Sequence, residues 1–266
     1  MKFRLIAIDL DDSLLYHDLT VSQRNRKAIQ EAARRGIIVT IATGRMYRAT
    51  RPFIDMLDIN VPVITYQGAM IVDGATNEIL RHSPVPLEWA RKIVDFAHQE
   101  NVHIQVFLKD EYYFEEANRF SELYGSVIGF KGHPVGPLKD FLQEPPTKMI
   151  IIDEPQRILA LQGQARQFFG NQLEISISKP HYLEFTQPDA NKGKAVQYLA
   201  NLLDIGADEV IAIGDSFNDI PMLSFACLGI AMGNAPQEVK DAADYVTASN
   251  NEDGVAVAIE KFALVD

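Results

Sequence analysis

The sequence predicts an α/β protein with a doubly wound parallel (Rossmann-like) core sheet and an inserted α+β cap domain. Two observations predict it. Short apolar strands alternate with helical stretches before residue 83, and the same alternation returns after residue 187. Residues 83–186 follow another pattern, in which strands and helices come in separate runs. We therefore expect one discontinuous core from residues 1–82 and 187–266, interrupted by a cap from residues 83–186.

The first part of the core begins with an apolar run at residues 4–10, which is typical of a buried parallel strand. Ser22 is placed to cap a helix that Gly36 ends. Asp73 and Gly74 indicate a hairpin turn between two further strands. The other expected elements are strands at 37–42, 63–66, 69–72 and 78–80, and a helix that ends near residue 57.

The expected cap contains helices at 87–99 and up to residue 169, and a loop rich in Gly and Pro up to Pro146. Its expected strands are 103–108, 112–114, 148–153, 173–178 and 182–186. The second part of the core is expected to contain helices at 193–203 and 255–262 and short apolar strands at 210–213 and 228–232. Strand 63–66 is expected to continue the parallel core sheet.

Composition narrows the class of partner. The chain has 266 residues and a formal net charge of -11, so nucleic acid and anionic membrane are poor partners on charge alone. No apolar stretch approaches the ~20 residues of a membrane helix, and the N-terminal run is too short for a signal peptide. The one cysteine, Cys227, allows no internal disulfide, and its apolar neighbours predict burial. We expect a cytoplasmic protein; its oligomeric state is left open.

Four polar elements follow or flank the ends of the predicted core strands, where parallel α/β sheets bind their ligands. They are Asp9-Leu10-Asp11, Thr43-Gly44-Arg45, Asn191-Lys192-Gly193 and Gly214-Asp215 with Asn218-Asp219. If the first is fully extended, both carboxylates lie on one face. Grouped carboxylates repel one another and favour a hard divalent cation, so we expect Mg²⁺ on Asp9, Asp11 and Asp215, with Asp219 behind them.

The same groups suit phosphoryl transfer. Asp9 can attack phosphorus and form an aspartyl-phosphate, while Asp11 serves as acid and then as base. The Thr43 hydroxyl and the N–H groups of Gly44 and Arg45 can bind phosphate at a helix start. Lys192 adds a fixed positive charge, and Asn218 is a further candidate contact to the phosphate.

These residues resemble the four motifs of the haloacid-dehalogenase-like superfamily. Asp9-Leu10-Asp11-Asp12-Ser13, Thr43, Lys192 and Gly214-Asp215-Ser216-Phe217-Asn218-Asp219 match in order and span almost the whole chain. The runs around Thr43 and Lys192 and the size of the insertion are similar to the Cof-type branch. The resemblance implies a magnesium-dependent phosphatase for small phosphate monoesters such as sugar or cofactor phosphates. It also implies Mg²⁺ on Asp9, Asp215 and the Asp11 carbonyl.

Two departures from that pattern stand out. Asp12 occupies a position that is usually Gly, although Asp tolerates left-handed backbone, and Gln67 occupies one that is usually Asn. The residues also fit a phosphomutase with the same nucleophile, or a degenerate phosphate-binding protein without catalysis. A response-regulator receiver domain is disfavoured by the chain length and by the acidic pair lying on the first strand.

Overall fold

The computed structural model describes residues 2–265, which form two compact units. The first unit contains the chain up to Arg45, Thr50–Arg81 and the chain from Asn191 onward. The second contains Met46–Ala49 and His82–Ala190. The first unit holds the predicted α/β core, and the second is the inserted α+β cap.

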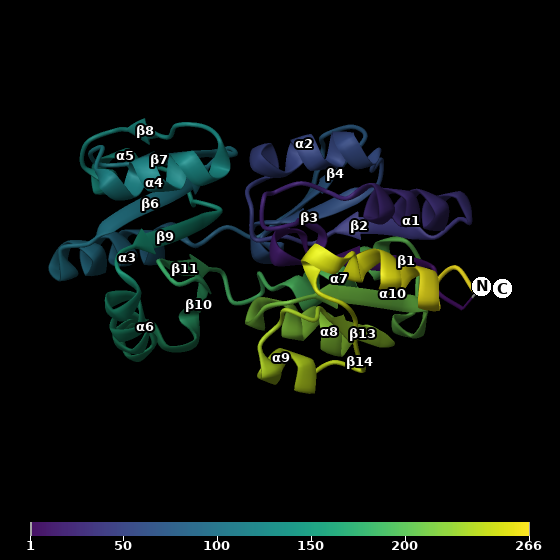
Figure 1. The fold of residues 1–266 in the computed structure, drawn as a ribbon. Helices are drawn as coiled ribbons and strands as arrows, with labels where there is room; N and C mark the ends of the chain where they lie inside the picture. The colour runs from purple at the N-terminus through teal and green to yellow at the C-terminus, as the bar shows by residue number, and fades with distance from the viewer. Residues whose placement is uncertain (1, 266) are drawn as a thin grey trace. The chain divides into compact units, whose positions relative to one another are not determined.

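The core is built on a five-stranded parallel sheet with the strand order β14-β13-β12-β1-β2 (Figure 1). Every residue of β1, which lies between β12 and β2, is at most 1% exposed, which explains its uninterrupted apolar sequence. Ile8 of β1 pairs in register with Ile213 of β12, so these two strands end at the same edge. The strands are β1 (Leu5–Ile8), β2 (Ile38–Ile41), β12 (Val210–Gly214), β13 (Leu228–Ala231) and β14 (Tyr245–Val246).

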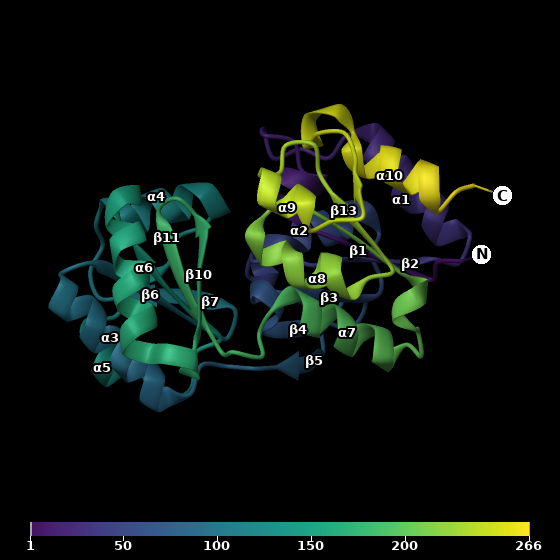
Figure 2. The same cartoon turned by 90° about the horizontal axis from the view of Figure 1, so that it is seen from below.

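Helices cover both faces of this sheet, as a doubly wound fold requires. In Figure 2, α1 and α10 lie together on one face, and α7 and α8 lie on the other. Ser22 caps α1 as predicted, because its side chain accepts a hydrogen bond from the Asn25 N–H. The core helices are α1 (Gln23–Arg34), α7 (Lys192–Leu202), α8 (Ile220–Phe225), α9 (Gln237–Asp241) and α10 (Gly254–Phe262), and α2 (Tyr47–Leu57) follows β2.

The third predicted strand does not continue the parallel sheet. Strand β3 (Pro62–Thr65) pairs antiparallel with β4 (Met70–Asp73), and β5 (Ile79–His82) completes a separate three-stranded sheet. A parallel bridge between Ala42 and Ile64 links β3 to the end of β2. The predicted alternation of strand and helix is confirmed, but β3 pairs with its hairpin partner β4 instead of extending the parallel sheet.

The cap contains a six-stranded sheet with the order β10-β11-β9-β6-β7-β8. One face packs its apolar side chains against α3, α5 and α6, including Val106, Met149 and Ile151. The strands are β6 (His103–Leu108), β7 (Glu111–Phe114), β8 (His133–Pro134), β9 (Lys148–Ile152), β10 (Glu174–Lys179) and β11 (Tyr182–Thr186). The helices are α3 (Leu87–Glu100), α4 (Arg119–Ile128), α5 (Leu138–Phe141) and α6 (Pro155–Phe169).

The expected loop before Pro146 is wrong, because this segment contains α4, α5 and β8. The start of α4 is set by a capping box, in which the Asn118 side chain accepts from the Ser121 N–H and the Ser121 hydroxyl accepts from the Asn118 N–H. Tyr124 on this helix packs against Phe107, Tyr112 and Tyr182. Gly129 caps the end of α4 and Pro137 precedes α5, so Gly and Pro in this segment mark the ends of helices.

Two other expectations have clear outcomes. Cys227 is exposed, contrary to the prediction, because it lies in the turn between α8 and β13 and not inside either element. Among residues 2–265, every helix is too short or too polar to cross a membrane.

A buried ion pair lies within the cap sheet. Lys148 Nζ on β9 lies 3.2 Å from Glu184 Oε1 on β11, and the two residues are 2% and 4% exposed. The Ser178 hydroxyl on β10 donates to the same oxygen at 2.7 Å. These contacts link the three strands β9, β10 and β11. A buried charge that loses its partner has no water to solvate it, so breaking the pair is costly.

Replacing Lys148 with Met should destabilise the cap by about 3 kcal/mol, because Glu184 would be left buried without its cation. The measurement is urea unfolding followed by Trp89 fluorescence, since the only tryptophan lies on α3 of the cap. Lys139→Met is the matched control, because its pair with Asp95 is exposed and should contribute less than about 1 kcal/mol. Equal midpoints for the two variants would contradict a structural role for the buried pair.

Candidate active site

The site lies at the edge where β1 and β12 end. Asp9 follows β1, and Asp215 follows β12. The Asp9 N–H donates to the Ile213 carbonyl at 2.9 Å, so the end of β1 is fastened to the neighbouring strand beside Asp215. Because β1 and β12 are parallel and in register, residues far apart in the sequence reach one point.

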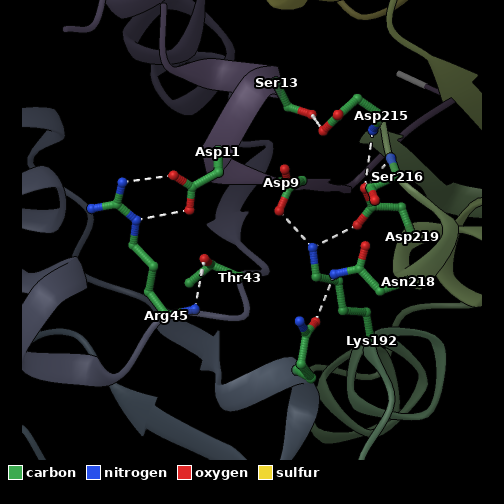
Figure 3. A network of polar contacts seen from close by, with 11 residues as sticks. Asp9, Asp11, Ser13, Thr43, Arg45, Lys192, Asp215, Ser216, Asn218 and Asp219 are labelled. Atoms are coloured by element: carbon green, nitrogen blue, oxygen red, sulfur yellow. Dashed lines mark hydrogen bonds and ion pairs between the residues drawn. The ribbon is translucent and has the colours of Figure 1, made fainter. Parts of the chain in front are cut away.

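Lys192 is the cation at the centre of this group (Figure 3). It is the first residue of α7, and Asn191 caps the helix by accepting from the Lys194 N–H at 2.9 Å. Its Nζ lies 2.5 Å from Asp9 Oδ1 and 2.5 Å from Asp219 Oδ1. Lys192 is 1% exposed, so two carboxylates take the place of water as the partners of its ammonium group.

Asp219 supports its neighbours with both carboxylate oxygens. Oδ1 contacts Lys192, and Oδ2 accepts from the backbone N–H groups of Asp215 and Ser216, each at 2.9 Å. The absence of a side chain at Gly214 is needed here, because a Cβ would lie 2.5 Å from the Asp219 carboxyl carbon. Asp219 thus fixes the loop that presents Asp215, while its expected place behind a bound cation stays a prediction.

Ser13 belongs to the first sequence motif, but the sequence analysis assigned it no role in the site. Its hydroxyl donates to Asp215 Oδ1 at 2.8 Å, and the residue is fully buried. This hydrogen bond fixes the rotamer of Asp215 from the β1 side of the site (Figure 3). The signal that could have identified it is its place four residues after Asp9, within the turn that follows β1.

The donor set fits a divalent cation. One oxygen from each of Asp9, Asp215 and Asp219 can be chosen so that all lie within 4.8 Å of one another. One ammonium group cannot neutralise three ionised carboxylates, of which those of Asp9 and Asp219 are buried, so the ionised cluster retains negative charge. Hard oxygen ligands of this kind are those that Mg²⁺ prefers.

The pKa values of the cluster follow from burial and crowding. Burial raises the pKa of Asp9 well above its ordinary value; Lys192 opposes this, while Asp219 and Asp215 raise it further. Burial and the charge of Asp219 raise the pKa of Asp215 to about 7. Burial works against a charged Lys192, but the carboxylates of Asp219 and Asp9 outweigh it and raise the lysine pKa. A cation would favour the ionised carboxylates.

Asp11 points away from this cluster. Arg45 Nε and Nη2 donate to its two carboxylate oxygens at 2.8 and 2.6 Å, a bidentate pair that Figure 3 shows opposite Lys192. The premise of an extended Asp9–Asp11 segment does not hold, because Leu10 begins a turn and Asp11 and Asp12 break its helical geometry. Asp9 and Asp11 therefore do not share a face as they would on a strand.

Asp12 adopts the left-handed conformation that the turn demands, with φ +58°. The turn thus survives the replacement of the usual Gly, as expected. The Asp12 carboxylate is about half exposed (48%) and faces His17 across 4.0 Å.

Thr43 and its neighbours form another part of the site. The buried Thr43 hydroxyl accepts from the Arg45 N–H at 3.1 Å and so keeps its own hydrogen for an incoming oxygen. Helix α2 begins only at Tyr47, so the Arg45 N–H does not stand at a helix start as expected and is already engaged. Asn218 Nδ2 donates to Gln67 Oε1 at 2.7 Å.

Comparison with known proteins agrees with this architecture. The family model for haloacid dehalogenase-like hydrolases matches residues 6–259. The chain is 31% identical to the Bacillus subtilis phosphatase YwpJ, covering 95% of this chain and 97% of that protein. It is 30% identical to the Bacillus subtilis 5-amino-6-(5-phospho-D-ribitylamino)uracil phosphatase YcsE, covering 99% and 97%.

Solved structures show the same fold. A haloacid dehalogenase-like hydrolase from Bacteroides thetaiotaomicron superposes with a TM-score of 0.89 at 27% identity, covering 98% of this chain and 99% of that one. A protein from Thermotoga maritima superposes with a TM-score of 0.86 at 30% identity, covering 98% and 97%. The match of sequence, fold and strand-end residues shows that this chain belongs to the haloacid dehalogenase-like hydrolase family and is a phosphoric monoester hydrolase.

Proposed function

We propose that this enzyme is a magnesium-dependent phosphatase that transfers the phosphoryl group of a small phosphate monoester to Asp9 and then to water. The contact of Lys192 with both Asp9 and Asp219 carries the proposal. It places a fixed positive charge beside a buried carboxylate at the end of the first strand. Phosphoryl transfer needs this positioning and charge stabilisation.

Asp9, Asp215 and the Asp11 carbonyl would hold the cation, with Asp219 and Ser13 fixing Asp215 from behind. When bound, Mg²⁺ supplies charge that binds the phosphate and neutralises its developing negative charge. The remaining work falls to the protein. Lys192 offsets charge on Asp9 and on the phosphoryl oxygens, and the Thr43 hydroxyl donates to one of those oxygens.

Asp11 is proposed as the acid and base. As a carboxylate held by Arg45, it is ready to take a proton from the water that attacks the aspartyl-phosphate. In the first step it must instead carry a proton for the leaving alkoxide, so the contact with Arg45 has to loosen during the cycle. This gives Arg45 two possible partners, the Asp11 carboxylate and a substrate phosphate.

The substrate class is proposed as sugar or cofactor phosphates. The site residues can bind only the phosphate group, so the rest of the ester is left to the cap. Two Bacillus subtilis relatives are named as 5-amino-6-(5-phospho-D-ribitylamino)uracil phosphatases, which supports a substrate class that includes phosphates of this kind. A screen of such esters, with pyridoxal phosphate, flavin mononucleotide and hexose phosphates, is the direct way to identify the substrate.

Asp9→Asn should lower Mg²⁺-dependent phosphate release by about 10³-fold or more, because the amide is a poor nucleophile and a poor cation ligand. The measurement is release of inorganic phosphate from the best ester of the screen, with product analysis. Asp208→Asn is the matched control, because Asp208 is exposed before β12, at the opposite end of that strand. A positional isomer as the product would indicate a mutase, and full activity of Asp9→Asn would contradict the proposal.

Mg²⁺ binding should weaken as pH falls from 8 to 6. The pKa of Asp215 is raised to about 7, so below that pH its proton competes with the cation. Titration calorimetry in buffers of different ionisation enthalpy should show proton release on binding near pH 7. Asp215→Asn should bind far more weakly and release fewer protons, whereas affinity independent of pH in the native enzyme would refute the assignment.

The raised pKa of Asp215 also affects the stability of the metal-free protein, and its effect on stability runs opposite to its effect on Mg²⁺ affinity as pH rises. A carboxyl group with a raised folded pKa binds more protons when folded, so its contribution to stability falls as pH rises from about 4 through 7. Mg²⁺ should therefore stabilise the protein against urea more at pH 8 than at pH 6. Asp215→Asn, measured in parallel, separates this contribution from that of other titrating groups.

A further inference from the structure

The side-chain amide of Asn218 has one satisfied end and one unsatisfied end. Its Nδ2 donates to Gln67 Oε1 at 2.7 Å, whereas its buried Oδ1 has no hydrogen-bond partner among residues 2–265. Buried polar atoms are almost always paired, so such an atom in a native site calls for an explanation. Figure 3 shows Asn218 beside Lys192, within the group of proposed phosphate contacts.

Two carboxamides can pair in either sense, because each carries a donor and an acceptor. In the reversed sense, Gln67 Nε2 donates to Asn218 Oδ1, and the Asn218 NH₂ group turns to the place where the orphaned oxygen stood. A phosphate oxygen is an acceptor and is bound only by a donor. The reversed sense therefore pairs the oxygen and leaves the Asn218 NH₂ group with an N–H to donate to another acceptor.

The backbone holds Gln67 firmly in this position. Three consecutive residues, Tyr66, Gln67 and Gly68, have positive φ values of 53°, 60° and 98°. The run is fastened to the Thr43 segment by hydrogen bonds from the Gln67 N–H to the Thr43 carbonyl and from the Tyr66 N–H to the Arg45 carbonyl, at 3.1 and 2.9 Å. Strained backbone of this kind persists where the surroundings over-determine it, and is concentrated at functional sites.

Two glycines, Gly44 and Gly68, leave the space that this arrangement needs. A Cβ on Gly44 would lie 2.3 Å from Gln67 Nε2, so the amide occupies the space that a side chain would need. A Cβ on Gly68 would lie 2.5 Å from the Asn191 carbonyl, just before Lys192. Gln67, which is 6% exposed, thus connects the Thr43 segment to Asn218, and the next residue, Gly68, lies against the segment that carries Lys192.

We propose that Gln67 is a positioning residue that sets the orientation of the Asn218 amide, so that the Asn218 NH₂ group donates to the substrate phosphate. The inference rests on the proposed function, since it assigns a residue to the same phosphate site. Gln67 stands where the family usually has Asn. The inference assigns its side-chain amide a role in phosphate binding, in addition to the strained turn that its backbone forms.

The test is a double-mutant cycle on the affinity for inorganic phosphate in the presence of Mg²⁺. Gln67→Met keeps the length of the side chain but removes the amide, and should weaken phosphate binding and raise KM about tenfold. Asn218→Ala should have a similar effect. In the Asn218→Ala background, Gln67→Met should cost less than twofold, because the residue acts through Asn218. Gln197→Met, on the exposed side of α7, is the control.

Additive losses in the cycle, or unchanged phosphate affinity in Gln67→Met, would overturn the inference. If Gln67→Met does not fold, the native enzyme still decides. Its Asn218 NH₂ signals in a ¹⁵N–¹H spectrum, identified with Asn218→Asp, should shift on adding phosphate with Mg²⁺, and static signals would refute the role. A native enzyme that neither binds phosphate nor hydrolyses any ester would defeat the proposed function as well.

Discussion

The contact of Lys192 with Asp9 and Asp219 is the interaction on which the site depends. Asp9 after β1 and Asp215 and Asp219 after β12 bring three carboxylates together, two of them buried, and such a group needs accompanying positive charge. The ammonium group of Lys192 supplies part of that charge, and a divalent cation would supply the rest. The fold brings these groups together because β1 and β12 are adjacent and parallel, and because α7 begins at the same edge of the sheet.

Other residues hold the two carboxylates, those of Asp215 and Asp11, that Lys192 does not contact. Asp219 and Ser13 fix Asp215 through backbone and side-chain hydrogen bonds, while Arg45 fixes Asp11 away from the cluster. Under the proposed function, Asp9, Lys192 and the Asp215 loop would stay in place during the reaction, whereas the pair of Asp11 and Arg45 would open and close. That division suits a two-step reaction in which the nucleophile stays in place and the proton carrier changes its state.

Much of the fold and the site could be predicted from sequence because the core strands are short, wholly apolar and end in polar motifs. Parallel strands place those ends together, so Asp9, Lys192, Asp215 and Asp219 could be grouped without a structure. The antiparallel pairing of β3 could not, since an apolar run does not specify its partner. The helix α4 lies in a segment whose Gly and Pro residues indicate a loop, so it was not predicted. The pairing of Asp11 with Arg45 depends on the turn that begins at Leu10, after the end of β1.

The central claim is that Asp9 becomes transiently phosphorylated, and trapping that species tests it most directly. Asp11→Asn removes the base of the second step, so an ester whose leaving group needs no protonation, such as 4-nitrophenyl phosphate, should let the phosphoenzyme accumulate. After acid quenching and borohydride reduction, mass spectrometry should find the resulting homoserine at position 9. Turnover of this ester with unmodified Asp9, and with phosphate on another residue or on none, would contradict the account.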